Sequence, residues 1–328
     1  MRALLLVALT ACASFESADI VLDLRVLAMA ADVPDQVIEI DLSAGEPRPQ
    51  DLIDQLVPST MCALVADPKE DRRLRYTMTL CRRCDEGCCE DSTVRIPVAT
   101  GVIEDPELAV PAPIMCGTVQ PNSSLLGLLL EVFNDDIFRG IGGIDYGVVL
   151  AVGGENDDPA LDQIGGKTLR VNPRIPETVA ANTNPTLLGF DAEPYTADGG
   201  RLDPSPMPMG RCVDQTAPLT LVPTQKVRIT PVEPENIRET YVVPTIDGLG
   251  ATFTESLTYQ WLAGAGGLSP GTSGGPRDFS GSPAPLFTEY RAPAAADLDG
   301  PTDIPLWIVQ RDERLGTAWF ESCVRVVP

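Results

Sequence analysis

The sequence predicts an all-β protein, and three observations support this fold class. Thirty-one prolines and 28 glycines interrupt the 328-residue chain at short intervals. The runs between them are short and rich in Val, Ile, Leu and Thr, which is the composition of β-strands. Hydrophobic residues make up 44% of the chain, enough to form real cores. The length suits two domains.

The same order of strands occurs twice along the chain. A start strand runs into an acidic residue and a proline, an alternating strand with a bulky residue follows, and a strand–turn–strand hairpin closes the unit. The matching segments are 22–34 with 184–194, 74–78 (LRYTM) with 257–261 (LTYQW), and 146–171 with 304–326. This repetition predicts two units of similar fold.

The repeated order resembles tandem immunoglobulin-like (Ig-like) β-sandwiches. The closing stretch WIVQRDERLGTAWFESCVRVVP resembles the last hairpin of bacterial Ig-like and PKD-like surface modules. Trp261 stands where such folds place a core tryptophan, and Met78 takes that place in the first copy. The resemblance implies two sandwiches, at 12–180 and 181–328, with a close joint near 176–190. An all-β chain of another topology is the alternative.

One segment departs from the all-β pattern. Its apolar residues recur at helical spacing, with Asn122 or Ser123 able to cap the start and Arg139 with Gly140 marking the end. The pattern predicts a helix over 122–139, inserted in the first sandwich. A membrane-inserting or partner-binding helix is one interpretation, and packing against the first sandwich is the one we expect. The apolar run 125–130 is too short to span a bilayer.

The first twelve residues, MRALLLVALTAC, have the layout of a secretory signal. The LTAC tetrapeptide resembles the lipobox of bacterial lipoproteins. The resemblance implies that residues 1–11 are removed and that Cys12 carries the lipid that anchors the protein to the membrane. No aspartate follows Cys12, which in enteric lipoproteins favours the outer membrane. We therefore expect a lipid-anchored outer-membrane protein that faces the periplasm or the cell surface.

Four of the nine cysteines fall within CRRCDEGCCE, at Cys81, Cys84, Cys88 and Cys89. Acylation of Cys12 leaves eight cysteines (nine minus one), an even number in an oxidising compartment, which favours disulfides. The chain has no histidine, so zinc sites that use it are excluded. A four-cysteine metal site or a redox role for this cluster is the alternative.

The Ig-like resemblance also implies one disulfide pair. The opening segment and the last strand of such a sandwich are neighbours, so Cys212 and Cys323, alone in the second copy, can pair. The cysteines that remain would pair among themselves within the first domain, with open connectivity. They are Cys62, Cys81, Cys84, Cys88, Cys89 and Cys116.

The sequence offers little catalytic chemistry. Without histidine there is no Ser-His-Asp or Cys-His machinery, and no pair among the 47 acidic residues is singled out. Asp297, Asp299 and Asp303 have the approximate spacing of calcium ligands, but the frame of an EF-hand is missing, so we expect a solvated turn and no cofactor. The net charge of −23 excludes nucleic acid as a partner.

These observations predict a non-catalytic extracytoplasmic lipoprotein with a role in adhesion, envelope structure or complex assembly. Its partners would be the membrane, through Cys12, and other envelope proteins or surface polymers. Two other classes stay open. One is a hydrolase, or its accessory module, that uses carboxylates alone, and the other is a metal-binding or redox protein that uses the Cys81–Cys89 cluster.

Overall fold

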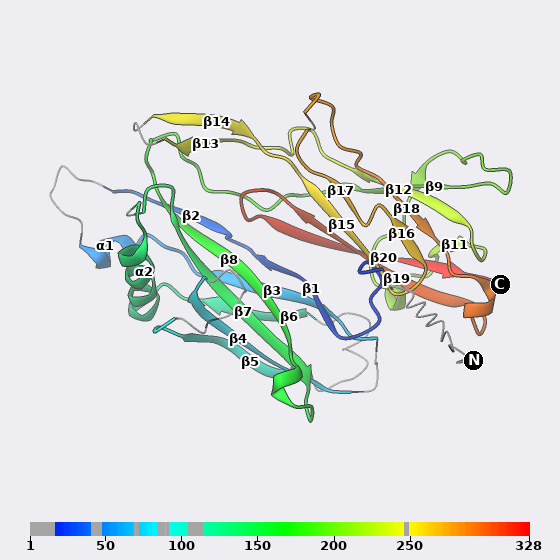
Figure 1. Ribbon diagram of the computed structural model, residues 1–328, viewed down its shortest axis with the longest axis horizontal. Helices are drawn as coiled ribbons and strands as arrows, with labels where there is room; N and C mark the ends of the chain where they lie inside the picture. The colour runs from blue at the N-terminus through cyan, green and yellow to red at the C-terminus, as the bar shows by residue number, and fades with distance from the viewer. Residues whose placement is uncertain are drawn as a thin grey trace, which may run out of the picture.

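A computed structural model gives the structure of the chain. It describes residues 17–40, 48–68, 72–83, 89, 92–103, 114–138, 140–245, 249–277 and 279–328. Nearly all of the regular structure in these ranges is β-strand, with two α-helices and three short 3₁₀ turns (Figure 1). The all-β prediction is confirmed.

The first sandwich consists of a five-stranded and a three-stranded sheet. In spatial order the five-stranded sheet contains β2 (Asp35–Ile38), β8 (Gln163–Pro173), β7 (Ile144–Gly154), β4 (Leu74–Arg82) and β5 (Ile96–Ile103). The three-stranded sheet contains β1 (Arg25–Ala31), β3 (Ser59–Ala66) and β6 (Ile114–Val119). All neighbours are antiparallel except β2, which runs parallel to β8.

The second sandwich repeats this plan. One sheet contains β11 (Leu219–Leu221), β20 (Thr317–Val326), β19 (Thr302–Arg311), β15 (Thr258–Ala263) and β17 (Thr272–Gly274). The other contains β10 (Ser205–Pro206), β9 (Gly189–Pro194), β12 (Lys226–Val232), β18 (Thr288–Arg291) and β16 (Gly267–Ser269). As in the first copy, a short strand, here β11, runs parallel to the last strand, β20. A separate hairpin, β13 (Thr240–Pro244) and β14 (Gly250–Thr254), is inserted before β15.

The predicted repeat corresponds to equivalent strands of the two sandwiches. The central strands β4 and β15 each lie beside a closing hairpin, β7–β8 in the first copy and β19–β20 in the second. Met78 on β4 and Trp261 on β15 are both buried. This shared strand order, with a parallel strand at the far side of each hairpin, is that of an Ig-like sandwich.

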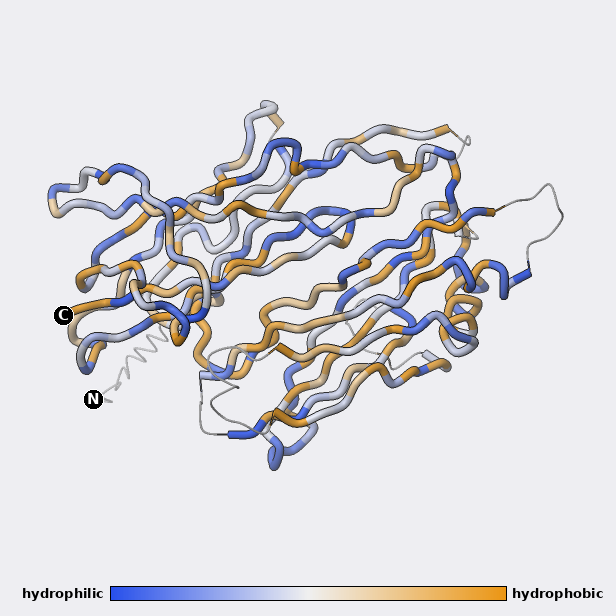
Figure 2. Tube along the Cα trace, turned by 180° about the vertical axis from the view of Figure 1, so that it is seen from behind, coloured by the Kyte–Doolittle hydropathy of each residue, from blue (hydrophilic) through white to orange (hydrophobic). Residues whose placement is uncertain are grey.

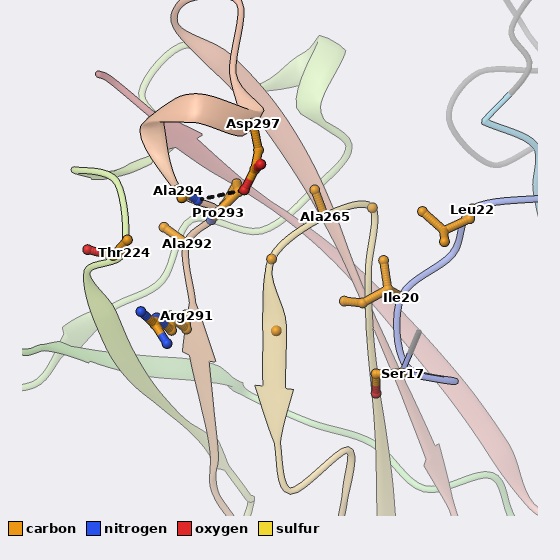
Figure 3. Close-up of a pocket in the computed structure, with 13 residues that line it drawn as sticks. Ser17, Ile20, Leu22, Thr224, Ala265, Arg291, Ala292, Pro293, Ala294 and Asp297 are labelled. Atoms are coloured by element: carbon orange, nitrogen blue, oxygen red, sulfur yellow. Dashed lines mark hydrogen bonds between the residues drawn. The ribbon is translucent and has the colours of Figure 1, made fainter. Parts of the chain in front are cut away.

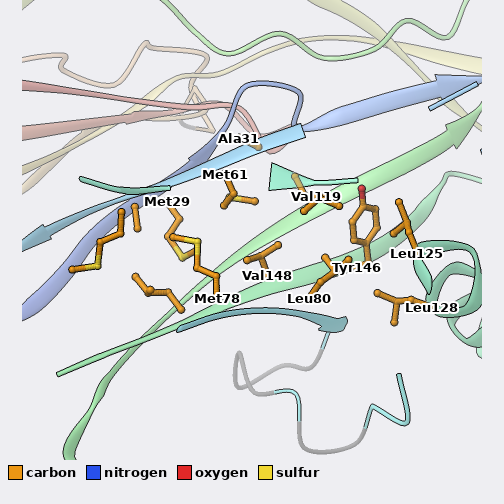
Figure 4. Packing of buried hydrophobic residues seen from close by; sticks show 14 of the residues in the cluster. Met29, Ala31, Met61, Met78, Leu80, Val119, Leu125, Leu128, Tyr146 and Val148 are labelled. Carbon is orange, nitrogen blue, oxygen red and sulfur yellow. The ribbon is translucent and has the colours of Figure 1, made fainter. Parts of the chain in front are cut away.

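The inserted helix α2 (Ser123–Asp135) covers one end of the first core, near the short helix α1 (Pro49–Ile53) (Figure 1). Figure 4 shows the core from close by. The Asn122 side chain accepts hydrogen bonds from the backbone N–H groups of Ser124 and Leu125, which caps the helix start. Leu125 and Leu128 point into the core that also contains Tyr146. The helix packs against the first sandwich, as we expected.

The helix is shorter than predicted. It ends at Asp135, before the predicted end at 139, because Asp136 has an extended backbone. The Asp136 carboxylate accepts hydrogen bonds from the backbone N–H groups of Phe138 and Gly140, which fixes a turn in place of another helical turn. Across the described residues, neither helix has the length and apolar character needed to cross a bilayer.

The two sandwiches stack face to face around a shared apolar layer. Neighbouring residues on β3 face different cores, since Ala63 and Val65 belong to the first core and Leu64 to the shared layer. On β19, Ile308 belongs to the second core and Trp307 to the shared layer. The shared layer contains Val21, Leu27, Ala28, Leu64, Ala66, Leu262, Trp307 and Val309, with Trp319 packed against it. The structure is therefore a stack of four sheets with three apolar layers between them.

The beginning of the described chain also joins the two sandwiches. The Ala263 N–H donates to the Asp19 carbonyl, and the Val21 N–H donates to the Ala263 carbonyl, at 2.9 Å each. Residues 19–21 thus lie beside β15 of the second sandwich, and the chain then crosses to β1 of the first. The predicted domain boundary between residues 180 and 181 assigns this segment to the first domain. That the two sides of this boundary are independent domains stays a prediction. In Figure 2, seen from behind, hydrophobic residues run along the strands of both halves.

Replacement of Trp307 by alanine tests the shared layer. Trp307 is 2% exposed and its indole fills the layer between β3 and β19. We expect Trp307→Ala to lower the free energy of unfolding by about 3–5 kcal/mol, because truncating a buried tryptophan leaves a cavity. Chemical denaturation measures the change. Leu202→Ala, at a residue that is 53% exposed, is the control and should leave the midpoint nearly unchanged.

Candidate functional site

The joint between the sandwiches is a polar cluster that connects distant parts of the chain. Its linker, residues 174–188, runs from β8 to β9. Buried Asn182 donates from its backbone to Asp35 of the first sandwich and from its side chain to Asp312 and to the Arg314 carbonyl of the second. Asn184 bonds to the Ala31 carbonyl and accepts from the Thr317 N–H. The close joint is thus fixed on both sides.

Arg314, on the turn between β19 and β20, is the central cation of this joint. Its side chain is only 12% exposed and donates to the Ala180 carbonyl of the linker. The same guanidinium lies 3.2 Å from Glu239 and 3.4 Å from Glu255, at the base of the β13–β14 hairpin. A longer ion pair of 3.8 Å reaches Asp35 in the first sandwich. One side chain therefore ties together both sandwiches, the linker and the hairpin.

The hairpin is attached through the same side chain. The Tyr241 ring lies under the Arg314 guanidinium, 4.8 Å from ring centre to carbon, which is a cation–π contact. The Tyr241 hydroxyl donates to Glu313 at 2.9 Å. The Phe253 ring, on the other strand of the hairpin, stacks on the Tyr241 ring, with the two ring centroids 5.7 Å apart. The orientation of β13–β14 thus follows that of Arg314.

Burial shifts the ionisation of several groups at the joint. It raises the pKa of Glu255 to about 7, and the nearby Asp312 and Glu239 carboxylates add to this effect while Arg314 and the Glu239 N–H oppose it. Burial also raises the pKa of Asp35, against hydrogen bonds from Asn182 and Asn172. These carboxylates are held by structural partners, so the arrangement supports the fold and offers no open acid–base pair.

Lys167 is a second cation that crosses between the sandwiches. From β8 of the first sandwich its ammonium donates to the Leu315 carbonyl and to the Thr317 hydroxyl of the second. Burial lowers the pKa of Lys167 to about 8, with Asp312 opposing the shift. The β19–β20 turn is therefore fixed to the first sandwich by two cations, Arg314 and Lys167.

An open hollow of about 770 Å³ lies on the second sandwich, beside the first described residues of the chain (Figure 3). Ser17 and Ile20 line one side, and Arg291, at the end of β18, lines the other. Thr224 and Asp297 complete the polar part of the wall. The Asp297 carboxylate is already used, since it accepts from the Ala294 N–H at 3.3 Å.

The calcium candidates do not converge. Asp303 forms a two-pronged ion pair with Arg325, with both N–O distances at 2.7 Å, and Asp297 caps its own turn. All three candidate aspartates, Asp299 included, are exposed. Within the described ranges, no group of three or more Asp, Glu, Cys or His side chains is placed to hold a metal ion. The calcium candidates therefore stay a weak prediction from spacing.

Three disulfides lie in the described part of the chain. Cys212, in a 3₁₀ turn before β11, is joined to Cys323 on β20, the pair that the Ig-like resemblance implies. Cys62 on β3 is joined to Cys116 directly opposite on β6, and Cys81 at the end of β4 is joined to Cys89. Each bond stays within one sandwich. Cys12, Cys84 and Cys88 lie outside the described residues.

The comparisons with known proteins give no family. No protein-family model matches the chain, and no curated protein does. Among solved structures, latent PorU from Porphyromonas gingivalis is similar over 93% of this chain, with 11% identity and a TM-score of 0.19, and this chain spans 24% of that one. The C-terminal domain of the Streptococcus agalactiae AgI/II polypeptide BspA is similar over 92% of this chain and 100% of its own length, with 9% identity and a TM-score of 0.17. At such TM-scores these similarities carry no argument about function.

The raised pKa of Glu255 gives a pH dependence to test. Its pKa is about 7 in the folded protein against 4.5 for a free glutamate, so the folded state binds the extra proton. The stability that this proton confers is fully present below pH 4.5 and is lost as the pH rises through 7. We expect the free energy of unfolding to fall by roughly 1–3 kcal/mol between these values.

Denaturation at a series of pH values measures this fall. Glu255→Gln keeps an oxygen to accept from the Glu239 N–H and should flatten the curve in that window. Glu177→Gln, at an exposed linker position, is the matched control and should leave the slope unchanged. A wild-type curve that rises steadily from pH 5 to pH 7 would contradict the assignment.

The disulfides predict the thiol content of the purified protein. With Cys12 acylated and three pairs formed, we expect the two remaining cysteines of the cluster, Cys84 and Cys88, to pair as well. Alkylation under denaturing, nonreducing conditions should then find no free thiol, and alkylation after reduction should find eight. Two free thiols, or a bound metal that is released by their alkylation, would favour the metal-binding or redox alternative.

Proposed function

We propose that this chain is a non-catalytic lipoprotein of the outer membrane, held by a lipid on Cys12, that acts in adhesion, envelope architecture or complex assembly. The observation that carries the proposal is the cysteine at the end of the N-terminal apolar run, in LTAC. A covalent lipid at that position anchors a folded body without a membrane-spanning helix.

The construction of the body supports a mechanical or assembly role. Apolar side chains from both sandwiches form one shared layer, and the Arg314 and Lys167 contacts lock the joint. A chain whose domains share a core moves as one rigid unit, whereas a small polar interface would allow relative motion. A rigid unit suits a protein that holds a position or presents a surface.

The disulfides support the extracytoplasmic part of the proposal. Each sandwich contains at least one disulfide, and such bonds persist in oxidising compartments. The bond between Cys81 and Cys89 also occupies two of the four thiols that a metal site in the cluster would need.

The position of the anchor has a geometric consequence. Ser17 lies five residues after Cys12 (17 − 12 = 5), and Asp19 is already bonded to Ala263. A chain of five residues spans at most about 18 Å, so the lipid would hold the body close to the membrane. The β13–β14 hairpin lies at the opposite end of β15 from Ala263 and would point away from the anchored end (Figure 1).

Replacement of Cys12 tests the anchor. Labelled palmitate should enter the wild-type protein, and that protein should partition into the detergent phase. Cys12→Ser should lose the label and appear in the aqueous phase or keep its signal sequence. Ala13→Ser, one residue away, should be labelled like the wild type. Failure of the wild-type protein to incorporate palmitate would overturn the lipoprotein proposal.

A further inference from the structure

The β13–β14 hairpin has an outer strand whose edge is free. Among the described residues β14 pairs with β13 alone, and the hairpin belongs to neither sandwich sheet. In Figure 1 it lies at the upper left border of the molecule. An unpaired strand edge presents a row of backbone donors and acceptors that can pair with another strand.

The register identifies which backbone groups face this edge. The Glu255 N–H donates to the Glu239 carbonyl and the Thr245 N–H donates to the Leu249 carbonyl, so these are hydrogen-bonded pairs of the hairpin. Such pairs alternate with non-bonded pairs along an antiparallel ladder. Gly250, Thr252 and Thr254, opposite Pro244, Val242 and Thr240, fall at the non-bonded positions. Their N–H and C=O groups therefore point outward, and all three residues are exposed.

This edge lacks the features that protect other outer strands. Charged side chains, prolines and very short length normally prevent edge pairing. Among the outer strands, β5 contains Pro97 and β10 contains Pro206, β1 and β2 carry a charged residue each, and β11, β16 and β17 have three residues each. Strand β6 has neither proline nor charge, but it lies close against β5, since a Cβ at Gly117 would meet the Ala99 side chain at 2.7 Å. Residues 249–254, Leu-Gly-Ala-Thr-Phe-Thr, contain neither proline nor charge. The unprotected edge is accordingly suited to a partner strand.

The sequence of β14 is complementary to itself. In an antiparallel pair centred on Thr252, Thr252 faces its own copy, Ala251 faces Phe253, and Gly250 faces Thr254. Each of the last two pairs sets a large residue against a small one, and no like charges face each other. Phe253, now 48% exposed beside Tyr241, would be covered by the alanine of the partner strand.

We propose that β14 pairs antiparallel with β14 of a second copy of this chain, with Thr252 on the two-fold axis. The outward groups of Gly250, Thr252 and Thr254 would then form the new ladder, and the two hairpins would become one four-stranded sheet. This is an isologous contact, which closes at two copies. The proposal is independent of the lipid anchor, although anchoring two copies to one membrane would raise their effective concentration.

Cross-linking through introduced cysteines tests the register. Opposed residues of a hydrogen-bonded antiparallel pair have Cα atoms about 5.5 Å apart, within the range of a disulfide. We expect full-length Thr252→Cys to give a covalent dimer on a nonreducing gel, with peptide mapping that joins residue 252 to residue 252. Thr254→Cys is the matched control, since its Cα atoms would lie about 14 Å apart in the dimer, and it should remain monomeric.

Proline substitutions in the Thr252→Cys protein test the edge itself. Thr254→Pro removes an outward N–H of β14 and should abolish the dimer. Val242→Pro is the control: Val242 lies opposite Thr252 on β13, so its outward N–H is on the other border of the hairpin, and the dimer should still form. Retention of the Cys212–Cys323 bond reports folding of each variant. Equal cross-linking at 252 and 254, no dimer for Thr252→Cys, or a covalent bond to a different protein would each overturn the proposal.

Discussion

The shared apolar layer between the two sandwiches is the constraint on which the rest of the structure depends. It requires that β3 and β19 be hydrophobic on both faces, because each strand faces one core on one side and the shared layer on the other. Residues 61–66, MCALVA, and 304–309, IPLWIV, are accordingly almost continuous apolar runs. Strands that are buried on both faces have this composition, whereas strands with one wet face alternate.

The polar joint depends on this layer as well. Stacking the sheets brings the β19–β20 turn against β8, where Lys167 and Arg314 are partly buried. A buried cation is costly unless it is paired and hydrogen-bonded, and these two have carbonyl, hydroxyl and carboxylate partners from both sandwiches. The ion pairs therefore fix the relative position of the two sandwiches, while the apolar layer supplies most of the stabilisation.

The sequence predicted the parts of the fold that depend on local pattern. The alternating strands at Met78 and Trp261 and the two closing hairpins are set by residue type and turn spacing, and the structure has them at those places. The Ig-like resemblance gave the Cys212–Cys323 pair for a topological reason, since the last strand returns beside the opening segment. The helix end was missed because it depends on the Asp136 side chain bonding to the turn beyond it.

The stacking and the joint were not predicted, although one signal was present. The apolar run in β3 has no polar face, and a strand of an isolated two-sheet sandwich would show one. The repeated strand order gives the fold of each copy and carries no information about what covers the outer face of either. Arg314 could not be singled out, because its partners Asp35, Ala180 and Glu239 are distant in sequence and meet only in the stack.

The position of the free edge of β14 also depends on the joint between the sandwiches. Tyr241 is held by Arg314, and Phe253 is held by Tyr241, so the hairpin takes its direction from the joint. An isolated two-stranded hairpin is marginally stable in water, so this one depends on its contacts with the joint. The outer strands of the described sheets are short, carry a charge or a proline, or, like β6, lie close against a neighbouring strand. The molecule therefore presents an uncharged free edge on an element whose position the stack of sheets determines, which is the property that a specific pairing surface requires.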